Sequence, residues 1–101
     1  MIYISGPMTG LPDLNFPAFH AAAAALRAAG LQVLNPAELD HGNDPAWDVC
    51  LRGDIVALVG CSSILMLDGW MQSKGARLER HIAVQLGMPV HYDIDKLQVA
   101  A

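Results

Sequence analysis

Short apolar segments alternate with longer helical patterns along this chain. The segments that we expect to form strands are residues 1–5, 31–34, 63–67 and 89–92, and the expected helices are residues 16–29, 45–60 and 73–86. Strands that alternate with helices predict βαβ units, and therefore a parallel sheet covered by helices. We expect an α/β fold with a small, doubly wound, three-layer parallel sheet of about four to five strands, flavodoxin- or Rossmann-like, in which residues 1–101 form a single domain.

Capping and turn residues predict where the helices begin. Asn15 can cap the first helix, and Asp44 followed by Pro45 is typical of the start of the second. The polar connection over residues 37–43 is expected to fold over or near a site. The tail over residues 93–101 carries no strong structural signal.

The composition is apolar for so small a domain. Of the 101 residues, 53% are hydrophobic and only 16% are charged. This balance indicates that a partner subunit covers part of the surface, so we expect a homo-oligomer, most simply a dimer. The net charge of −4 and only six Lys and Arg residues argue against binding to a nucleic acid polymer. The sequence also lacks an apolar run of the roughly 18 residues that a membrane span requires.

The cysteines and histidines give no sign of a metal centre. Cys50 and Cys61 lie inside apolar segments without the spacing of metal ligands, so we expect buried thiols in a reducing cytoplasm. The four histidines are dispersed. The N-terminus reads directly as a strand, with no pattern of a secretion signal. We expect a cytoplasmic protein with no metal and no cofactor.

Glu79 occupies an unusual position for a carboxylate. At about 100° per residue, the helix places it on one face with Gly75, Ala76, Ile82, Ala83 and Leu86. A carboxylate there is costly unless it is paired, hydrogen-bonded or facing a cavity. Gly75, one turn earlier, leaves room for a ligand beside the acid. The alternative is that Glu79 reaches the rim or pairs with a partner in the core.

Asp54 is a second carboxylate on an apolar face. It lies between Trp47, Leu51 and Leu58 on the expected helix over residues 45–60. Two such acids in one small chain indicate a site. The alternative is that Gly53 breaks the helix and leaves Asp54 as the cap of a new one.

Turn-forming and polar residues follow two of the expected strands. Those after the first strand are Ser5, Gly6, Pro7, Met8, Thr9 and Gly10, and those after the third are Asp68, Gly69 and Ser73. The first loop is neither a Walker A loop nor a G-x-G-x-x-G fingerprint, although its glycines allow backbone N–H groups to approach an anion. Because ligands of parallel sheets bind at the carboxyl ends of strands, we expect both loops at one site.

Together these residues resemble the nucleoside 2-deoxyribosyltransferase superfamily. The similarity is greatest to its small branch that opens with Y-I-S-G-P-M-T-G, which matches residues 3–10. It extends to Arg52-x-Asp54, to Ser73-x-Gly75-x-x-x-Glu79, and to Ala83 and Leu86-Gly87-x-Pro89-Val90, and so covers residues 3–90.

The resemblance implies a function and a role for each site residue. It implies cleavage of an N-glycosidic bond, or transfer of the base, on a nucleoside or nucleoside 5′-monophosphate. Glu79 would be the nucleophile that forms a covalent glycosyl intermediate, Tyr3 would orient it, and Asp54 would protonate or position the leaving base. Ser73 would contact the sugar or its 5′ group. From their expected place at the carboxyl edge of the sheet and beside Glu79, the residues expected to bind substrate are Ser5, Gly6, Pro7, Met8, Thr9, Gly10, Asp68, Gly69, Ser73 and Gly75.

Ser73 bears on the choice of substrate. Transferases that act on free nucleosides have an Asp at this position, whereas the nucleotide hydrolases of the superfamily have a Ser. A hydroxyl at a helix N-terminus suits a 5′-phosphate. Those hydrolases, however, place an Arg in the first loop, where this chain has Met8 and Thr9. Two alternatives therefore stay open: a nucleotide-binding module without turnover, and a structural or interaction subunit.

Overall fold

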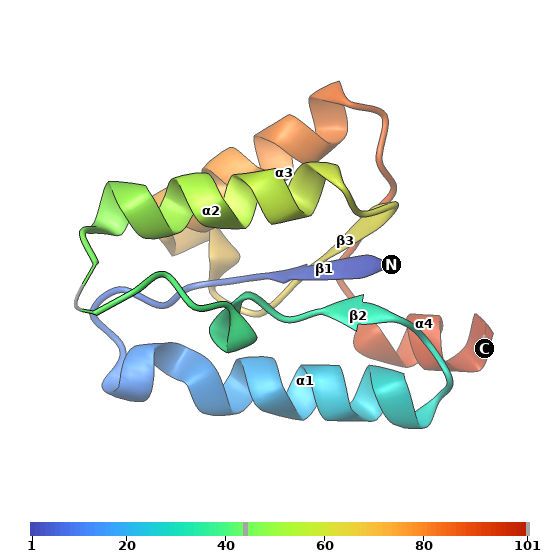
Figure 1. The fold of residues 1–101 in the computed structure, drawn as a ribbon. Helices are drawn as coiled ribbons and strands as arrows, with labels where there is room; N and C mark the ends of the chain where they lie inside the picture. Colours follow the sequence, from blue (N-terminus) through green and yellow to red (C-terminus); the bar gives the residue numbers. More distant parts are fainter. Residues whose placement is uncertain (44, 101) are drawn as a thin grey trace.

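A parallel sheet of four strands runs through the middle of the fold (Figure 1). The structure is a computed structural model that describes residues 1–43 and 45–100. The strands are β1 (Ile2–Ser5), β2 (Val33–Leu34), β3 (Ser63–Met66) and β4 (Val90–His91), in the order β2-β1-β3-β4. Every neighbouring pair is parallel, with Tyr3 beside both Leu34 and Ile64. The predicted α/β fold with a small parallel sheet is confirmed.

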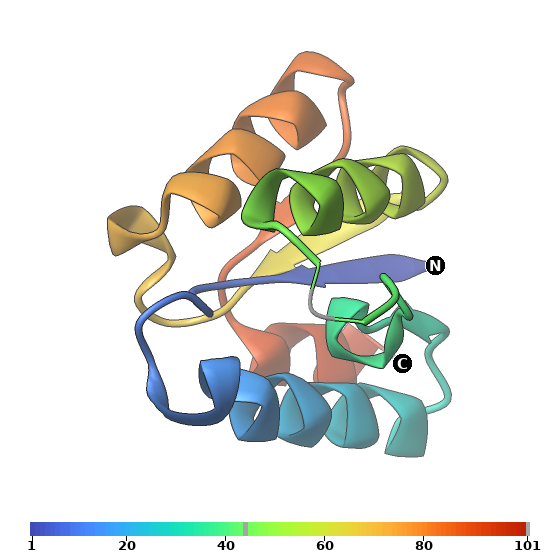
Figure 2. The same cartoon turned by 60° about the vertical axis from the view of Figure 1, so that its left-hand side comes forward.

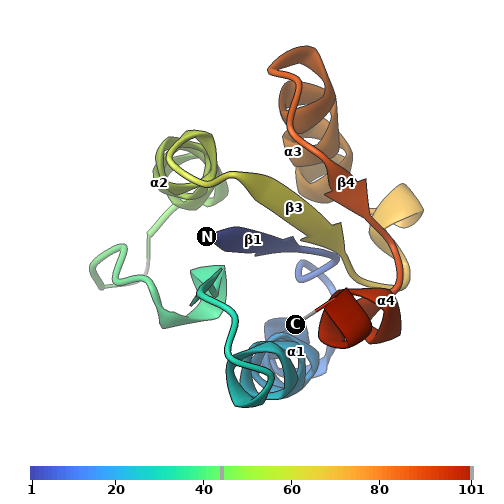
Figure 3. The same cartoon turned by 90° about the vertical axis from the view of Figure 1, so that its right-hand side faces the viewer.

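Helices cover both faces of this sheet (Figure 3). On one face lie α1 (Phe16–Ala28) and α4 (Ile94–Ala100), and on the other lie α2 (Trp47–Val59) and α3 (Lys74–Gln85). The arrangement is therefore doubly wound with three layers, as expected. Among the described residues, no helix is long and apolar enough to cross a membrane.

The alternation of side chains along β1 divides the core into two. Ile2 and Ile4 pack toward α1 and α4, together with Phe19 and Leu26. Tyr3 points to the opposite face, where its neighbours come from β3, α2 and α3. Because side chains two apart in a strand share a face, Ser5 follows Tyr3 toward α2 and α3. This alternation is what brings two hydroxyl groups of β1 to one place.

The carboxyl ends of β1 and β3 lead into two loops that pack closely together (Figure 2). The backbone N–H of Leu67 donates to the carbonyl of Ser5 at 2.8 Å. A Cβ added to Gly6 would lie 2.8 Å from the Cβ of Leu67, so the close approach requires glycine. The first loop continues into a short 3-10 helix, η1 (Pro12–Asn15), and the second into η3 (Trp70–Gln72).

Several predicted limits and caps differ from the structure. The strands are shorter than expected, because only residues that pair in the ladder count: β2 begins at Val33 rather than at residue 31, and β4 spans two residues rather than four. Helix α2 begins at Trp47, after Pro45, and the predicted cap Asp44 lies outside the described residues. Asn15 makes no capping hydrogen bond. Its φ of +60° accompanies a different bond, in which Nδ2 donates to the carbonyl of Pro7 at 2.9 Å.

Other corrections concern the ends of the chain and the degree of burial. The tail, for which the sequence carried no strong signal, forms α4, because Ile94 and Leu97 pack against the core on the α1 face. Leu86, placed on the apolar face of its helix by periodicity, is exposed because α3 ends at Gln85. Cys50 and Cys61 are free thiols that are partly buried, rather than buried as predicted.

A third short 3-10 helix, η2 (Pro36–Glu38), lies between η1 and η3 in the sequence and begins the connection from β2 to α2. Asn35 caps it by accepting from the backbone N–H of Ala37 at 3.0 Å. Arg27 of α1 forms an ion pair with Glu38 at 2.8 Å, which ties the start of this connection to the α1 face. The rest of the connection then passes to the other face and reaches α2.

Candidate active site

Glu79 lies at the centre of the candidate site. Its side chain projects from α3 toward β1 and is buried, with a relative exposure of 6%. Oε2 accepts a hydrogen bond from the hydroxyl of Tyr3 at 2.5 Å, and Oε1 accepts one from the hydroxyl of Ser5 at 2.7 Å. Each carboxylate oxygen therefore has one donor from β1, and these bonds fix the orientation of the carboxylate.

The surroundings of Glu79 change its acidity. Burial raises the pKa of the carboxyl from an ordinary value of 4.5 to about 7, against the two hydrogen bonds, which lower it. The negative charge of Asp54 raises it further. Burial, with the charges of Glu79 and Asp54, raises the pKa of Tyr3 well above its usual range, so its hydroxyl stays a donor. Because this pKa is close to neutral pH, Glu79 gains or loses a proton there at little cost in free energy.

Asp54 lies within α2, which continues unbroken through Gly53. The alternative of a helix break with Asp54 as a new cap is therefore wrong. Asp54 is paired with His41 instead: Nε2 of the imidazole lies 3.0 Å from Oδ1 of the carboxylate. Burial raises the pKa of Asp54, and the charge and hydrogen bond of His41 lower it. Among the described residues, no three His, Cys, Asp or Glu side chains group as a metal site.

Two adjoining hollows lie beside these acids. The inner cavity has a volume of about 290 Å³, and Tyr3, Asp54 and Glu79 all line it. The outer cleft has a volume of about 740 Å³ and lies between the two loops and the start of α3. Thr9, Trp47, Ser73 and Gly75 line both, so the two hollows adjoin. Their sizes fall in or near the range of roughly 300–1,000 Å³ that is typical of small-molecule sites.

Most of the predicted binding residues lie along these two hollows. The inner cavity is lined by Gly6, Met8, Thr9, Ser73 and Gly75, and the outer cleft by Pro7, Thr9, Asp68, Gly69, Ser73 and Gly75. Gly10 lines neither of them. Ser5 does not present its hydroxyl to a ligand, because it is 1% exposed and donates to Glu79. Its place in the predicted substrate loop is thus corrected to a partner of Glu79.

Ser73 has the position predicted for it. It precedes α3, and its Oγ accepts a hydrogen bond from the backbone N–H of Ala76 at 3.2 Å. A hydroxyl can donate as well as accept, so the Ser73 O–H remains able to face the outer cleft. Gly75 adds to the opening there, because a Cβ at this position would meet only ordinary contacts with Leu51 at 3.6 Å and Trp47 at 3.8 Å.

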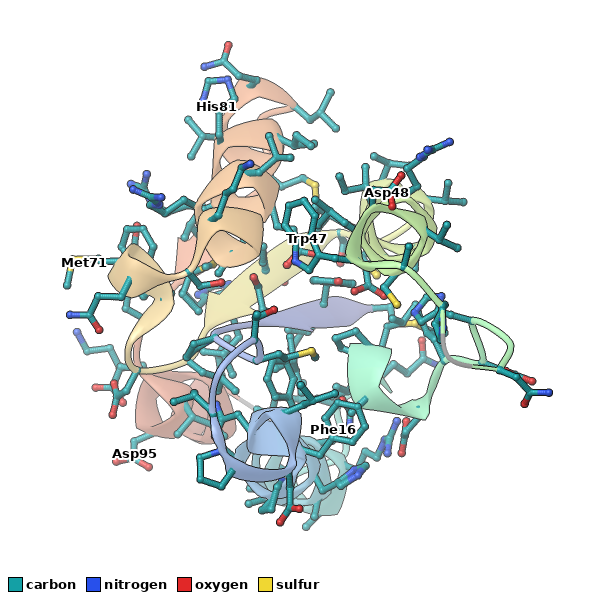
Figure 4. The ribbon with its side chains drawn as sticks, turned by 90° about the vertical axis from the view of Figure 1, so that its left-hand side faces the viewer. Phe16, Trp47, Asp48, Met71, His81 and Asp95 are labelled. Atoms are coloured by element: carbon teal, nitrogen blue, oxygen red, sulfur yellow. The ribbon has the colours of Figure 1, made fainter. Side chains whose placement is uncertain are left out.

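Three residues near the site were not predicted as part of it. The side chain of Trp47 lies between α2 and α3 (Figure 4) and lines both hollows, and the Nζ of Lys74 lies 5.3 Å from the centre of its ring. Cys50 lines the inner cavity. His41 was dismissed with the other dispersed histidines, although the connection that carries it was expected to fold near a site. The polar connection was the signal available in the sequence, and it indicated a loop near the site but not the contact between His41 and Asp54.

A comparison with known protein families places this geometry in context. The model of one family, described as "Domain of unknown function (DUF4406)", matches residues 1–92. The chain belongs to this family. No curated protein and no solved structure matches the chain. The matched residues include Tyr3, Asp54 and Glu79, together with both loops at the carboxyl edge of the sheet.

The arrangement offers two acids of different character to a bound molecule. Glu79 presents a carboxylate whose orientation is fixed by hydrogen bonds, and Asp54 presents a carboxyl whose pKa is raised by burial. Of the described residues, Lys74 supplies the cationic group in the lining of the outer cleft, and the inner cavity is lined by none. The inner cavity therefore favours a neutral group, or one that gains positive charge while it reacts.

Proposed function

We propose that this protein breaks the N-glycosidic bond of a nucleoside or nucleoside 5′-monophosphate, releasing the base or transferring it, through a covalent glycosyl intermediate on Glu79. The observation that carries the proposal is the buried carboxylate of Glu79, held by one hydroxyl donor on each oxygen at the wall of a cavity. The resemblance to the nucleoside 2-deoxyribosyltransferase superfamily supports the same reaction. No cofactor is required for it.

The reaction follows from the two acids. One oxygen of Glu79 attacks C1′ of the sugar as the bond from C1′ to the base nitrogen breaks, and the electron pair of that bond goes to the base. Asp54 gives its proton to the departing nitrogen. The transition state resembles an oxocarbenium ion, which the carboxylate of Glu79 stabilises. Water then attacks C1′, returns a proton to Asp54 and frees Glu79; a second base in place of water completes a transfer.

The outer cleft is the place for the 5′ end of the sugar. Ser73 stands at the N-terminus of α3, where the helix dipole and free N–H groups favour an anion. Lys74 and Thr9 line the same cleft and supply a charge and a hydroxyl. A 5′-monophosphate is the substrate that uses all three, even though Met8 and Thr9 stand where related hydrolases place an Arg.

The decisive experiment is an assay for released base. The protein is incubated with a panel of nucleosides and 5′-monophosphates, with ribose and with deoxyribose, and free base is measured by liquid chromatography. Glu79→Gln is expected to abolish release, because a neutral amide of the same size does not attack C1′. Glu38→Gln, a change of the same kind at an exposed glutamate, is the matched control and keeps full activity. A fully active Glu79→Gln protein refutes the proposed nucleophile.

A second candidate is a nucleotide-binding module without turnover. The raised pKa of Glu79, about 7, favours it, because a protonated carboxyl grips ribose hydroxyls but does not attack carbon. This candidate predicts a thermal shift with nucleotides and no free base from any of them. If neither a thermal shift nor base release occurs, the protein is a structural or interaction subunit. Intact-mass measurement after acid quench separates enzyme from binder directly, since only the enzyme carries a glycosyl adduct.

A further inference from the structure

His41 reaches the site from the connection between η2 and α2. Its Nε2 lies 3.0 Å from Oδ1 of Asp54, and both side chains are largely shielded, with 18% and 14% exposure. Asp54 is among the residues that line the inner cavity, and His41 is not. Oδ1 is therefore held by the loop, and Oδ2 is the oxygen that remains for a bound molecule.

Gly53 explains how the imidazole fits against α2. A Cβ added at this position would lie 2.8 Å from Cε1 and 2.9 Å from Nδ1 of His41. The ring thus packs on the bare backbone of the helix, next to the acid that it contacts. Glycine in the middle of a helix costs stability relative to alanine. A glycine stands at position 53, inside α2, because a side chain there would collide with the His41 ring.

We propose that His41 is a positioning residue for Asp54: it donates a hydrogen bond to Oδ1 and turns Oδ2 toward the departing base. The inference rests on the proposed function, because it assigns a partner to the acid of that reaction. His41 itself touches neither the sugar nor the base. It acts only through Asp54, because its hydrogen bond fixes the orientation of that carboxyl group.

The proton balance of the step fits this role. The hydrogen on Nε2 of His41 stays on the imidazole and is donated to Oδ1, while the dissociable proton of Asp54 sits on Oδ2. When the bond from C1′ to the base breaks, that proton moves from Oδ2 to the base nitrogen, and Asp54 becomes a carboxylate. The hydrogen bond from Nε2 then stabilises the new charge. Water restores the proton on Oδ2 when it attacks C1′.

The charged groups around the pair set how it titrates. Glu79 of α3 and Tyr3 of β1 share electrostatic interactions with Asp54, and Cys50 lies one turn before it on α2. The charge of Asp48 acts on Cys50, and Asp48 is itself paired with Arg52 at the exposed surface. Burial opposes ionisation of Asp54, and His41 favours it, so loss of His41 raises the pKa of Asp54 further.

A titration without substrate tests the contact. The carboxyl carbon of Asp54 is followed by ¹³C NMR against pH in the wild type and in four variants. His41→Ala removes the donor, Gly53→Ala pushes the ring away, His41→Gln keeps an N–H donor but not the charge, and His81→Ala changes an exposed histidine on α3 (Figure 4).

We expect the midpoint of the Asp54 titration to rise in His41→Ala and Gly53→Ala, to lie between these and the wild type in His41→Gln, and to stay unchanged in His81→Ala. An unchanged midpoint in His41→Ala overturns the inference. If that variant does not fold, Gly53→Ala and His41→Gln decide in the same way, because each keeps the connection and most of its contacts.

The rate of base release gives a second test of the role of His41. With a poor leaving base, we expect His41→Ala to lose about tenfold in kcat, a part of the roughly 10²–10⁴-fold that a placed general acid supplies. With a good leaving base the loss is smaller, and His41→Gln restores most of the rate. An equal loss for both bases overturns the positioning role. If the wild type releases no base at all, the proposed function fails, and the titration still decides whether His41 holds Asp54.

Discussion

Replacing Glu79 by glutamine tests the physical account of the site without any substrate. The pKa of Glu79 rises from 4.5 in the unfolded chain to about 7 in the folded protein, chiefly because the carboxylate is buried. The folded state therefore binds the proton more tightly than the unfolded state does between these two pH values. Folding stability falls as the pH rises through this window, and it is level again above it.

The size of the effect follows from the two pKa values. At about 1.36 kcal/mol per pKa unit, the difference between 4.5 and about 7 corresponds to about 3 kcal/mol of unfolding free energy. Glutamine resembles the protonated acid: its amide accepts from one of the two β1 hydroxyls and donates to the other. We expect Glu79→Gln to be more stable than the wild type by up to about 3 kcal/mol at pH 8, and nearly equal to it at pH 4.5.

Urea denaturation at half-unit steps from pH 4.5 to 8 measures this difference. With a slope of roughly 1.5 kcal/mol per molar for a domain of this size, the midpoints should separate by about 2 M at pH 8. Glu38→Gln is the control, because the Glu38 carboxyl is exposed and its pKa is lowered by Arg27, so its stability difference from the wild type changes with pH only in acid and stays constant from pH 5 to 8. Parallel curves for Glu79→Gln and the wild type across pH 5–8 would refute the reasoning.

Three further predictions concern catalysis, packing and assembly. Asp54→Asn should reduce base release most for poor leaving bases; equal losses for good and poor ones, measured by chromatography, would mean that Asp54 only positions the substrate. Gly6→Ala should destabilise the fold by about 1–3 kcal/mol, because its Cβ meets Leu67 at 2.8 Å, whereas Gly75→Ala should be neutral or stabilise α3 by up to about 1 kcal/mol in thermal melts. Light scattering over a dilution series should give the mass of a dimer. Val56, whose side chain is 72% exposed on α2, is the test position: Val56→Lys should shift the measured mass toward the 10.8 kDa of one chain. An active monomer at micromolar concentration would rule the dimer out.

The architecture and the central acid followed from patterns that the sequence displays directly. Apolar runs of strand length between helical segments predicted the parallel sheet, and helical periodicity predicted that Glu79 faces inward. The resemblance, rather than any pattern of the residues, implied that Tyr3 orients Glu79, and the hydrogen bond at 2.5 Å shows the two side chains in contact. Ser5 could have been added from strand geometry, since residues two apart in a strand share a face.

What escaped prediction depends on tertiary contacts between distant segments. Nothing in the residues around His41 says that it reaches Asp54, because the connection between them has no regular pattern. Gly53 suggested a helix break, as glycine often does, but the space that it leaves is filled by a ring from outside the helix. The tail was a different case: Ile94 and Leu97 have helical spacing, but so short a helix is stable only when it packs against the core.

The hydrogen bonds to Glu79 also bear on how the chain folds. Tyr3 and Glu79 are 76 residues apart in sequence, and Ser5 and Glu79 are 74 apart. Contacts of such separation close a loop of about three quarters of the chain, so they form late, after local helices and turns. A chain emerging from the ribosome holds its two hydroxyl donors long before the acid that they serve has been synthesised. The candidate site is therefore assembled only at the end of folding, and a chain that ends before α3 lacks Glu79.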